Sequence, residues 1–205
     1  HRVDRRQRQM CIRDSYTDDK ITESAAITGS KTIIRVRLES KKYLWEPFSN
    51  CFSGQYQIQR NLYKSNYGNK ILFEEINNDL GLTFRYQWCF SETYGFVKKS
   101  HLINHGDHEL SCELLDGIQN VLPYGVPSAT QNGSSNLVDA YKRNQLEPDV
   151  GLGIFALSAI IVDKAEPSEA LKATTVWSVG LDKAKHLISS LQLDAFRNGM
   201  SLEEE

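Results

Sequence analysis

Alternating apolar and polar positions run through the first half of the chain and predict β-strands. Residues 32–39 and 55–62 both alternate with a period of two and carry β-branched or aromatic residues, which is typical of half-buried strands. Between them, Trp45-Glu46-Pro47-Phe48 breaks the pattern. Because Pro47 has no N–H for a sheet hydrogen bond, we expect a loop or a sheet edge there.

The clearest predicted element is a β-hairpin whose strands are residues 70–77 and 82–91. Asn78-Asp79-Leu80-Gly81 supplies the turn, since Asn, Asp and Gly tolerate positive φ at little cost. Two interpretations compete for the aromatic row on the second strand: a platform that stacks on sugars or bases, or the inner face of a packed sheet. Aromatic rows are more often core, which favours the second. The row consists of Phe84, Tyr86, Trp88 and Phe90.

Residues 101–126 connect a further predicted hairpin to an irregular segment. The strands are residues 95–103 and 108–115, and we expect the chain to leave the hairpin through a turn at Asp116-Gly117. Three histidines crowd its tip, and on a helix their spacing would suit zinc. The turn residues exclude a helix, so we predict solvated histidines and no metal site. These are His101, His105 and His108.

The second half of the chain is less regular. Residues 122–147 predict a long loop with a short helix within 136–145, and loops of this length are usually functional or covered by a partner. Residues 150–162 are apolar on both faces, as expected of a central strand buried on both sides. Residues 171–179 are predicted to return as the strand that pairs with it.

Composition excludes few classes of protein, but it bears on partners. The chain has 205 residues, enough for one sizeable β domain or two small ones, and a net charge of −2. Its longest apolar run, residues 151–162, is shorter than the roughly 18 residues of a membrane helix. We therefore expect no membrane partner.

The first 15 residues are set apart by their charge. They carry five arginines against two aspartates, which would suit a nucleic-acid arm or a targeting peptide. However, QRQMCIRDS resembles a translated sequencing adapter of the kind found at the ends of metagenomic gene fragments. We interpret residues 1–15 as a non-native leader, and the argument for a nucleic-acid partner falls with it.

The four cysteines show no metal-ligand spacing and predict no structural disulfide. Cys89 and Cys112 alternate within strand patterns, where free cysteine behaves as a small apolar residue. This usage favours a reducing compartment such as the cytoplasm. The pattern calls for no cofactor.

The end of the chain changes to helical spacing. From Asp182 the apolar residues fall three or four apart, and Asn198-Gly199 is a helix stop. Ser201 to Glu204 then resembles a capping box that opens another helix. We interpret this as the start of a helical domain that the chain does not contain. Its docking face would be an exposed apolar patch of Leu187, Leu191 and Phe196.

Several segments together resemble the N-terminal region of cellobiose-phosphorylase-like proteins, a group of glycoside phosphorylases and hydrolases. They are residues 84–88 (FRYQW), 91–97 (SETYGFV), 102–104 (LIN) and 114–123 (LLDGIQNVLP). The resemblance implies an all-β fold, a two-sheet antiparallel β-sandwich of the supersandwich type followed by a C-terminal linker helix. It places the sandwich at residues 16–181 and the linker, with the start of an (α/α)6 barrel, at 182–205.

In that group the catalytic carboxylates lie in the barrel, so the resemblance transfers no catalytic residue to this chain. A glycosidase needs two carboxylates facing each other about 5–10 Å apart across the sugar. Glu74 and Glu75 are neighbours on a predicted strand and should point to opposite faces. Asp116 before Gly117 is more simply a turn residue. We assign no catalysis to them or to Glu113.

Two functions of different class remain open. The chain is either the non-catalytic sandwich of a carbohydrate-active enzyme, which supports the barrel, takes part in a homodimer and lends a loop to the sugar site, or a self-standing carbohydrate-binding or adhesive sandwich. An exposed coplanar pair of aromatic rings would favour the second. The loop candidates for sugar contact are Tyr124, Gln131 and Asn132, and the stacking candidates are Trp88, Tyr94 and Trp177.

Overall fold

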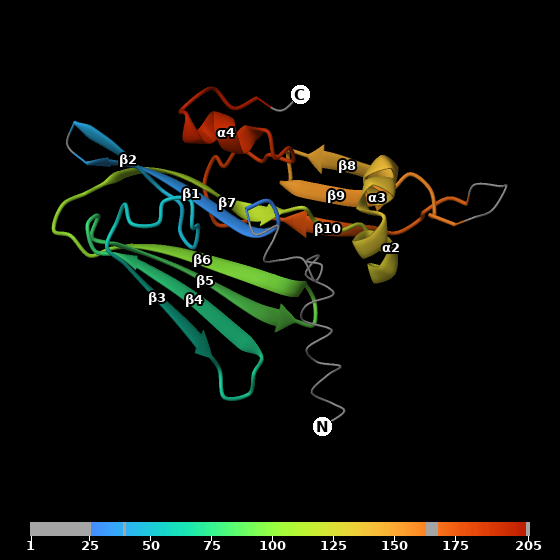
Figure 1. Ribbon diagram of the computed structural model, residues 1–205, viewed down its shortest axis with the longest axis horizontal. Coiled ribbons are helices and arrows are strands. Elements are labelled where there is room, and N and C mark those ends of the chain that lie inside the picture. Colours follow the sequence, from blue (N-terminus) through green and yellow to red (C-terminus); the bar gives the residue numbers. More distant parts are fainter. Residues whose placement is uncertain (1–25, 39, 163–167, 204–205) are drawn as a thin grey trace. The chain divides into compact units, whose positions relative to one another are not determined.

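A computed structural model describes residues 26–38, 40–162 and 168–203 (Figure 1). The chain forms two compact units. Thr32–Asp116 makes one, called here the sandwich unit; the described residues before Thr32 and after Asp116 make the other, called here the C-terminal unit. The predicted leader, residues 1–15, lies outside the described residues.

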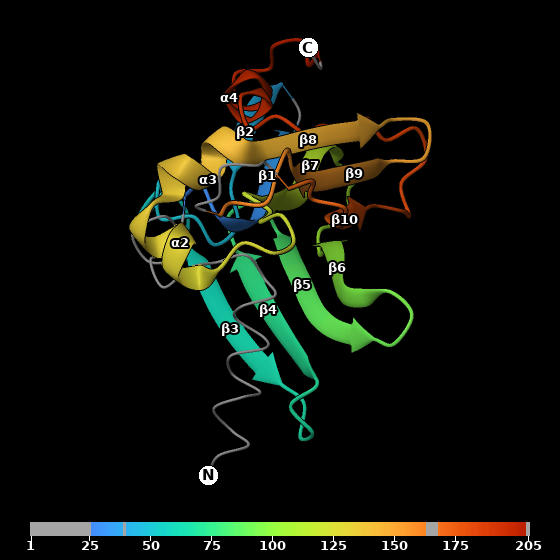
Figure 2. The same ribbon diagram turned by 90° about the vertical axis from the view of Figure 1, so that its right-hand side faces the viewer.

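The sandwich unit is built from two antiparallel sheets, which confirms the predicted all-β sandwich. One sheet has the order β2-β1-β7, and the other has the order β3-β4-β5-β6, whose four strands lie side by side in Figure 2. The strands are β1 (Gly29–Leu38), β2 (Lys41–Trp45), β3 (Ile58–Lys64), β4 (Lys70–Asn77), β5 (Leu82–Ser91), β6 (Gly95–Asn104) and β7 (Ser111–Gln119).

The core of this unit lies between the two sheets. β1 contributes Ile34 and Val36, β2 contributes Trp45, and β5 contributes Leu82 and Phe84, all at most 2% exposed. Half-buried residues of β6 and β7 pack against the same cluster. The period of two in each strand thus directs one apolar face of each sheet toward the other, which is the usual way antiparallel sheets bury hydrophobic area.

The hairpin of β4 and β5 forms at the predicted boundaries. Its register pairs Asn77 with Leu82, and Gly81 adopts the predicted positive φ, +63°. The Asn77 side-chain oxygen accepts a hydrogen bond from the Leu80 N–H, which closes the turn. Local turn chemistry is therefore sufficient to specify this hairpin.

The second predicted hairpin, formed by residues 95–103 and 108–115, is wrong. β6 and β7 belong to different sheets, so the segment between them crosses from one sheet to the other. Leu102 on β6 and Leu114 on β7 both pack on the core cluster, which requires the strands to face each other rather than share an edge. The turn expected at Asp116 is also wrong, because β7 continues to Gln119 and the positive φ falls at Asn120, +53°.

The C-terminal unit contains the third antiparallel sheet, with the order β10-β9-β8. The predicted central strand is confirmed as β9 (Leu152–Leu157), and the returning strand as β10 (Ala173–Trp177). The prediction that β9 is buried on both sides is wrong, because Leu152, Ile154 and Ala156 on one face are only half-buried. Two short helices, α2 (Ser128–Gly133) and α3 (Ser135–Tyr141), precede β8 (Lys142–Glu147). The helix predicted within 136–145 thus gives way to a strand at Lys142, because β8 pairs along its whole length with β9.

The end of the chain is less helical than its spacing predicts. Among the described residues after β10, only Gln192–Arg197 (α4) form a helix, so the helix expected from Asp182 is wrong for residues 182–191. Leu191 is 83% exposed, as the predicted apolar patch requires, but Phe196 is only 6% exposed. The prediction that Phe196 belongs to an exposed patch is therefore wrong. Ser201 lies outside any helix, and Glu204 lies outside the described residues. In the part of the chain that is described, no helix has the length and apolarity to cross a membrane.

Candidate functional site

Glu75 is a buried carboxylate held in the interior of the sandwich. One carboxylate oxygen accepts a hydrogen bond from the Trp45 indole N–H at 2.8 Å. The other accepts hydrogen bonds from the Phe48 backbone N–H and from Arg60 Nε, each at 2.7 Å. The side chain is 2% exposed, whereas Arg60 is 44% exposed. Phe48 has a positive φ, +64°, so this carboxylate holds an unfavourable backbone conformation in place.

Glu74 occupies the other face of β4, and its partners confirm that the two carboxylates diverge. It accepts from Asn61 Nδ2 at 2.8 Å, from the Tyr63 hydroxyl at 3.1 Å and from Arg85. The Asn61 hydrogen bond, followed by the Arg85 bond, lowers the pKa of Glu74, although burial acts in the opposite direction. The hydrogen bond that the Tyr63 hydroxyl donates to Glu74 raises the pKa of the Tyr63 phenol. Every carboxylate oxygen is thus committed to the fold.

Asp116 connects the two sheets of the sandwich. Asp116 lies on β7 and accepts hydrogen bonds from Thr32 Oγ1 on β1, at 2.6 Å, and from Ser100 Oγ on β6, at 2.7 Å. It also forms an ion pair with Lys98 Nζ on β6, at 2.7 Å. The Lys98 side chain is only 8% exposed, and its ammonium lies 5.4 Å from the Tyr86 ring centroid. Asp116 is therefore an inter-sheet link rather than the predicted turn residue.

The histidine group does not assemble. His105 shares a 2.8 Å hydrogen bond between its Nε2 and Thr83 Oγ1, while the His108 carbonyl accepts from Asn104 Nδ2. Over the described ranges, no group of three His, Cys, Asp or Glu side chains is placed to hold a metal ion. Cys51, Cys89 and Cys112 are free thiols, and burial raises the pKa of Cys112.

The aromatic row on β5 changes from buried to exposed along the strand. Phe84 is fully buried, Tyr86 and Trp88 are half-buried, and Phe90 is 63% exposed. Tyr94, in the turn after β5, is 62% exposed. Phe90 meets Phe96 edge to face at 76°, which does not make the flat pair of rings that stacks on a sugar.

The loop candidates lie close in sequence but have different surroundings. Tyr124 is 55% exposed, and Lys172 Nζ lies 4.9 Å from its ring centroid. Gln131 and Asn132 lie on α2, where Gln131 is half-buried and Asn132 is exposed. A pocket of about 510 Å³ beside α2 and α3 is lined by neither of them. Their role in sugar contact stays a prediction.

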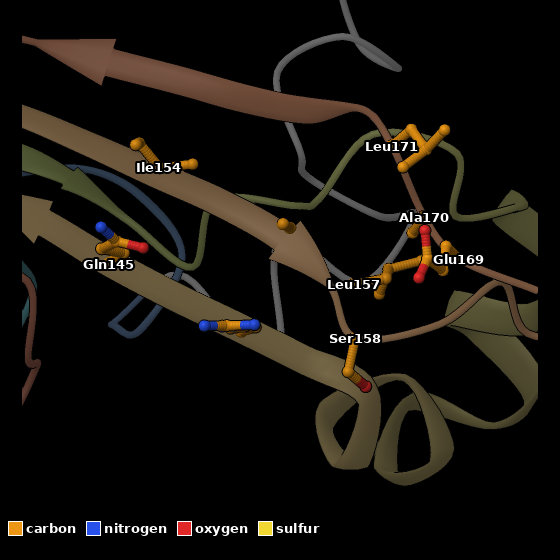
Figure 3. Close-up of a pocket in the computed structure, with 9 residues that line it drawn as sticks. Gln145, Ile154, Leu157, Ser158, Glu169, Ala170 and Leu171 are labelled. Atoms are coloured by element: carbon orange, nitrogen blue, oxygen red, sulfur yellow. The ribbon is translucent and has the colours of Figure 1, made fainter.

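The sequence did not single out a polar pocket on the third sheet. Its volume is about 420 Å³, and Figure 3 shows Gln145 and Ile154 on neighbouring strands, with Glu169 and Leu171 on the segment before β10. Arg143 and Ser158 also line it. The sequence signal was weak because Leu146 is the one apolar residue of β8, so the strand character of β8 depends on pairing with β9.

Trp177 lies on the same face of this sheet. It is opposite Leu152, and Leu152 is opposite Glu147 on β8. Because side chains alternate between faces, Trp177, Thr175 and Ala173 share one face with Ile154 and Gln145. Trp177 is 45% exposed.

Trp45, the remaining tryptophan, is 1% exposed, so its ring is not accessible for stacking on a ligand.

The chain matches no protein-family model, and comparison with curated proteins finds no match. The resemblance to glycoside phosphorylases therefore remains a hypothesis that rests on the segments in which it was seen.

Proposed function

We propose that the chain is the non-catalytic N-terminal β-sandwich region of a carbohydrate-active enzyme, a glycoside phosphorylase or hydrolase. Its catalytic (α/α)6 barrel would belong to the same protein, outside these 205 residues. The sandwich would support the barrel and contribute a loop to the sugar site, with Tyr124, Gln131 and Asn132 as the candidate contacts.

The observation that carries this proposal is where the resembling segments lie in the fold. Residues 84–88 form the centre of β5, residues 91–97 its turn into β6, and residues 114–119 the end of β7. Asp116 of the last segment bonds Lys98 and Ser100 on β6, close to the second. Segments far apart in sequence thus build one packed and hydrogen-bonded unit, as expected if the resemblance reflects a shared sandwich.

The state of the buried carboxylates also supports a structural role. A catalytic acid or nucleophile must reach a substrate. The carboxylate oxygens of Glu74 and Glu75 instead accept hydrogen bonds from Asn61, from arginines and from the backbone. They point to opposite faces of β4, so they do not form the facing pair that glycoside hydrolysis uses. Carboxylates arranged in this way fasten strands and loops together.

The test is to recover the source gene across both ends of the chain by long-read sequencing. We expect the reading frame to continue past Glu205 into a long helix-rich region, and the first 15 residues to be replaced by other sequence. The full protein should then cleave a disaccharide such as cellobiose, with phosphate if it is a phosphorylase and without phosphate if it is a hydrolase. A stop codon directly after Glu205 would overturn the proposal.

A further inference from the structure

The edge strand β3 carries a row of backbone groups that point away from its own sheet. In the order β3-β4-β5-β6 it pairs with β4, and among the described residues no strand lies on its other side (Figure 2). The Asn78 N–H donates to the Gln57 carbonyl at 3.0 Å, and the Ser65 N–H donates to the Lys70 carbonyl at 3.0 Å. The odd-numbered residues of β3 therefore bond to β4, and the even-numbered ones direct their N–H and C=O groups outward. The outward residues are Ile58, Arg60, Leu62 and Lys64.

Apolar side chains are exposed on both faces of this strand. Leu62 is 65% exposed and Tyr63 is 49% exposed, and neighbouring residues of a strand point to opposite faces. A further strand at this edge, about 4.8 Å away, would place its own side chains beside both of them. The backbone and the side chains of β3 thus fit the same kind of partner, which is an extended strand.

Two other edges of the sandwich unit are protected against such pairing. At the far edge of the same sheet, Lys98 and Ser100 of β6 bind Asp116 of β7, which fastens that edge to the second sheet. The edge strand β2 begins with Lys41 and Lys42, both exposed, and charges on an edge strand oppose the approach of another strand. β3 has no two adjacent charges and lacks this protection.

The two cations of β3 leave room for a partner strand. Arg60 Nε forms an ion pair with Glu75 of β4 at 2.7 Å, so the charge of Arg60 is balanced within its own sheet. Lys64 stands at the last position of the strand. The centre of the edge therefore presents little uncompensated charge.

β3 is complementary to a second copy of itself. In an antiparallel pair centred on Asn61, Arg60 lies opposite Leu62 of the second copy, and Ile58 lies opposite Lys64. Every such pair joins two outward residues, so all eight outward groups of each copy, two on each of four residues, find partners. Each cation then faces an apolar residue. A register centred on Arg60 would place Arg60 opposite Arg60, and one centred on Leu62 would place Arg60 opposite Lys64.

We propose that two copies of the chain pair antiparallel through β3, centred on Asn61, so that two four-stranded sheets become one continuous sheet of eight strands. The partner is a second copy, because in this register the strand satisfies its own backbone groups and keeps its own cations apart. A contact one strand wide is at the lower end of interface sizes, so the dimer is weak, with a dissociation constant in the micromolar range. The inference does not rest on the carbohydrate role, and a gene that ends after Glu205 would leave it unchanged.

The test is the mass of the full 205-residue chain in solution, measured by sedimentation equilibrium at micromolar to millimolar concentrations. We expect the average mass to rise from that of one chain toward that of two and to stop there, because a symmetric pair uses up the edge. A chain that stays monomeric throughout overturns the inference and leaves the edge to a strand of a different protein. Growth beyond two chains overturns it as well.

A proline at the edge tests whether β3 is the contact. Leu62→Pro removes an outward N–H that β4 does not use, and proline is tolerated on edge strands, so the dissociation constant should rise about tenfold. Tyr67→Ala removes an aromatic ring that is 94% exposed in the β3–β4 turn, and should leave the dimer unchanged. A Leu62→Pro chain that dimerises as well as the parent overturns the inference.

A pair of substitutions at Ile58 tests the register without relying on proline. Ile58 lies opposite Lys64 of the second copy, and Lys64 has no ion-pair partner among the described residues. Ile58→Lys should dimerise about tenfold more weakly than Ile58→Glu, because like charges directly opposite each other destabilise a strand pair and the symmetric dimer contains two such pairs. Both variants lose the same apolar side chain, so a cost in folding affects them alike. Equal dissociation constants for the two variants would overturn the pairing centred on Asn61.

Discussion

In the sandwich unit, Glu74 and Glu75 have side chains at most 3% exposed, and each accepts a hydrogen bond from an arginine. In the C-terminal unit, Glu169 and Arg143 are exposed, and neither has an ion-pair partner among the described residues. The aromatic rings differ in the same way: Phe84 is 0% exposed in the first unit and Trp177 is 45% exposed in the second.

This difference separates residues that hold the fold from residues that lie exposed at the surface. A buried carboxylate is stable only when its oxygens are hydrogen-bonded, and that requirement leaves none of them for recognition. An exposed charge gains little stability from a partner in any case. Glu74 and Glu75, the two adjacent carboxylates of β4, therefore hold the fold together.

The largest effect we expect is a difference in the free energy of unfolding between substitutions at two positions of β5. Phe84→Ala should lower the free energy of unfolding by about 4 kcal/mol, because it leaves a cavity in the core. Phe90→Ala, at a position 63% exposed, should cost less than about 1 kcal/mol. Urea unfolding of both variants measures the difference. Equal losses would mean that the distal end of β5 is as much core as its centre.

A second prediction compares one carboxylate from each unit. Glu75→Ala should cost about 3 kcal/mol, because it leaves the buried Trp45 indole N–H and the Phe48 N–H without an acceptor. The loss should not be larger, since Arg60 is 44% exposed and can turn to water. Glu169→Ala should change stability by less than about 0.5 kcal/mol. A similar cost for both variants would remove the distinction between the units.

A third prediction concerns backbone packing in the C-terminal unit. Gly151 has a φ of +62°, and an added Cβ would lie 2.5 Å from His186 Cε1. Gly151→Ala should therefore cost about 2 kcal/mol, from backbone strain and the displaced ring together. Gly125 has a φ of +88° with nothing within 4 Å, so Gly125→Ala reports the strain alone and should cost less. Thermal unfolding of both proteins provides the comparison.

The smallest effect we expect is a pH dependence. The pKa of Glu74 is lowered in the fold, so its ionised form stabilises the protein above the unfolded value of 4.5, and this contribution is lost as pH falls through the lower folded pKa. Asn61→Ala removes the largest cause and should raise the pKa of Glu74 measured by NMR titration. Tyr63→Phe should raise it less. An unchanged pKa in Asn61→Ala would contradict the assignment.

Prediction from sequence succeeded where structure is local. The β4–β5 hairpin follows from alternation on both sides of Asn78-Asp79-Leu80-Gly81, so its boundaries can be read directly. It failed for β2, which is short, and for β8, which is mostly polar; both become strands by pairing with β1 and β9. It also failed for residues 182–191, whose apolar spacing suits a helix that does not form.

For the candidate site, the sequence identified Trp177 as an aromatic residue but had no means of joining it to Gln145, Arg143 and Glu169. Those residues come from different strands and a connecting segment, and their common face depends on the register of β8 and β10 on β9. Residue spacing along a chain contains no information on register between strands that are distant in sequence.

By itself, the sequence determined that the protein is built of strands, where its clearest hairpin turns, and that Phe84 lies in a core. These follow from period-two alternation and turn chemistry, which act within a few residues. Tertiary structure decided which sheet each strand joins, that Asp116 links two sheets instead of turning the chain, and that Glu74 and Glu75 are held by arginines. Those outcomes depend on long-range packing and on the cost of burying unpaired charge, and both are settled only when distant segments meet.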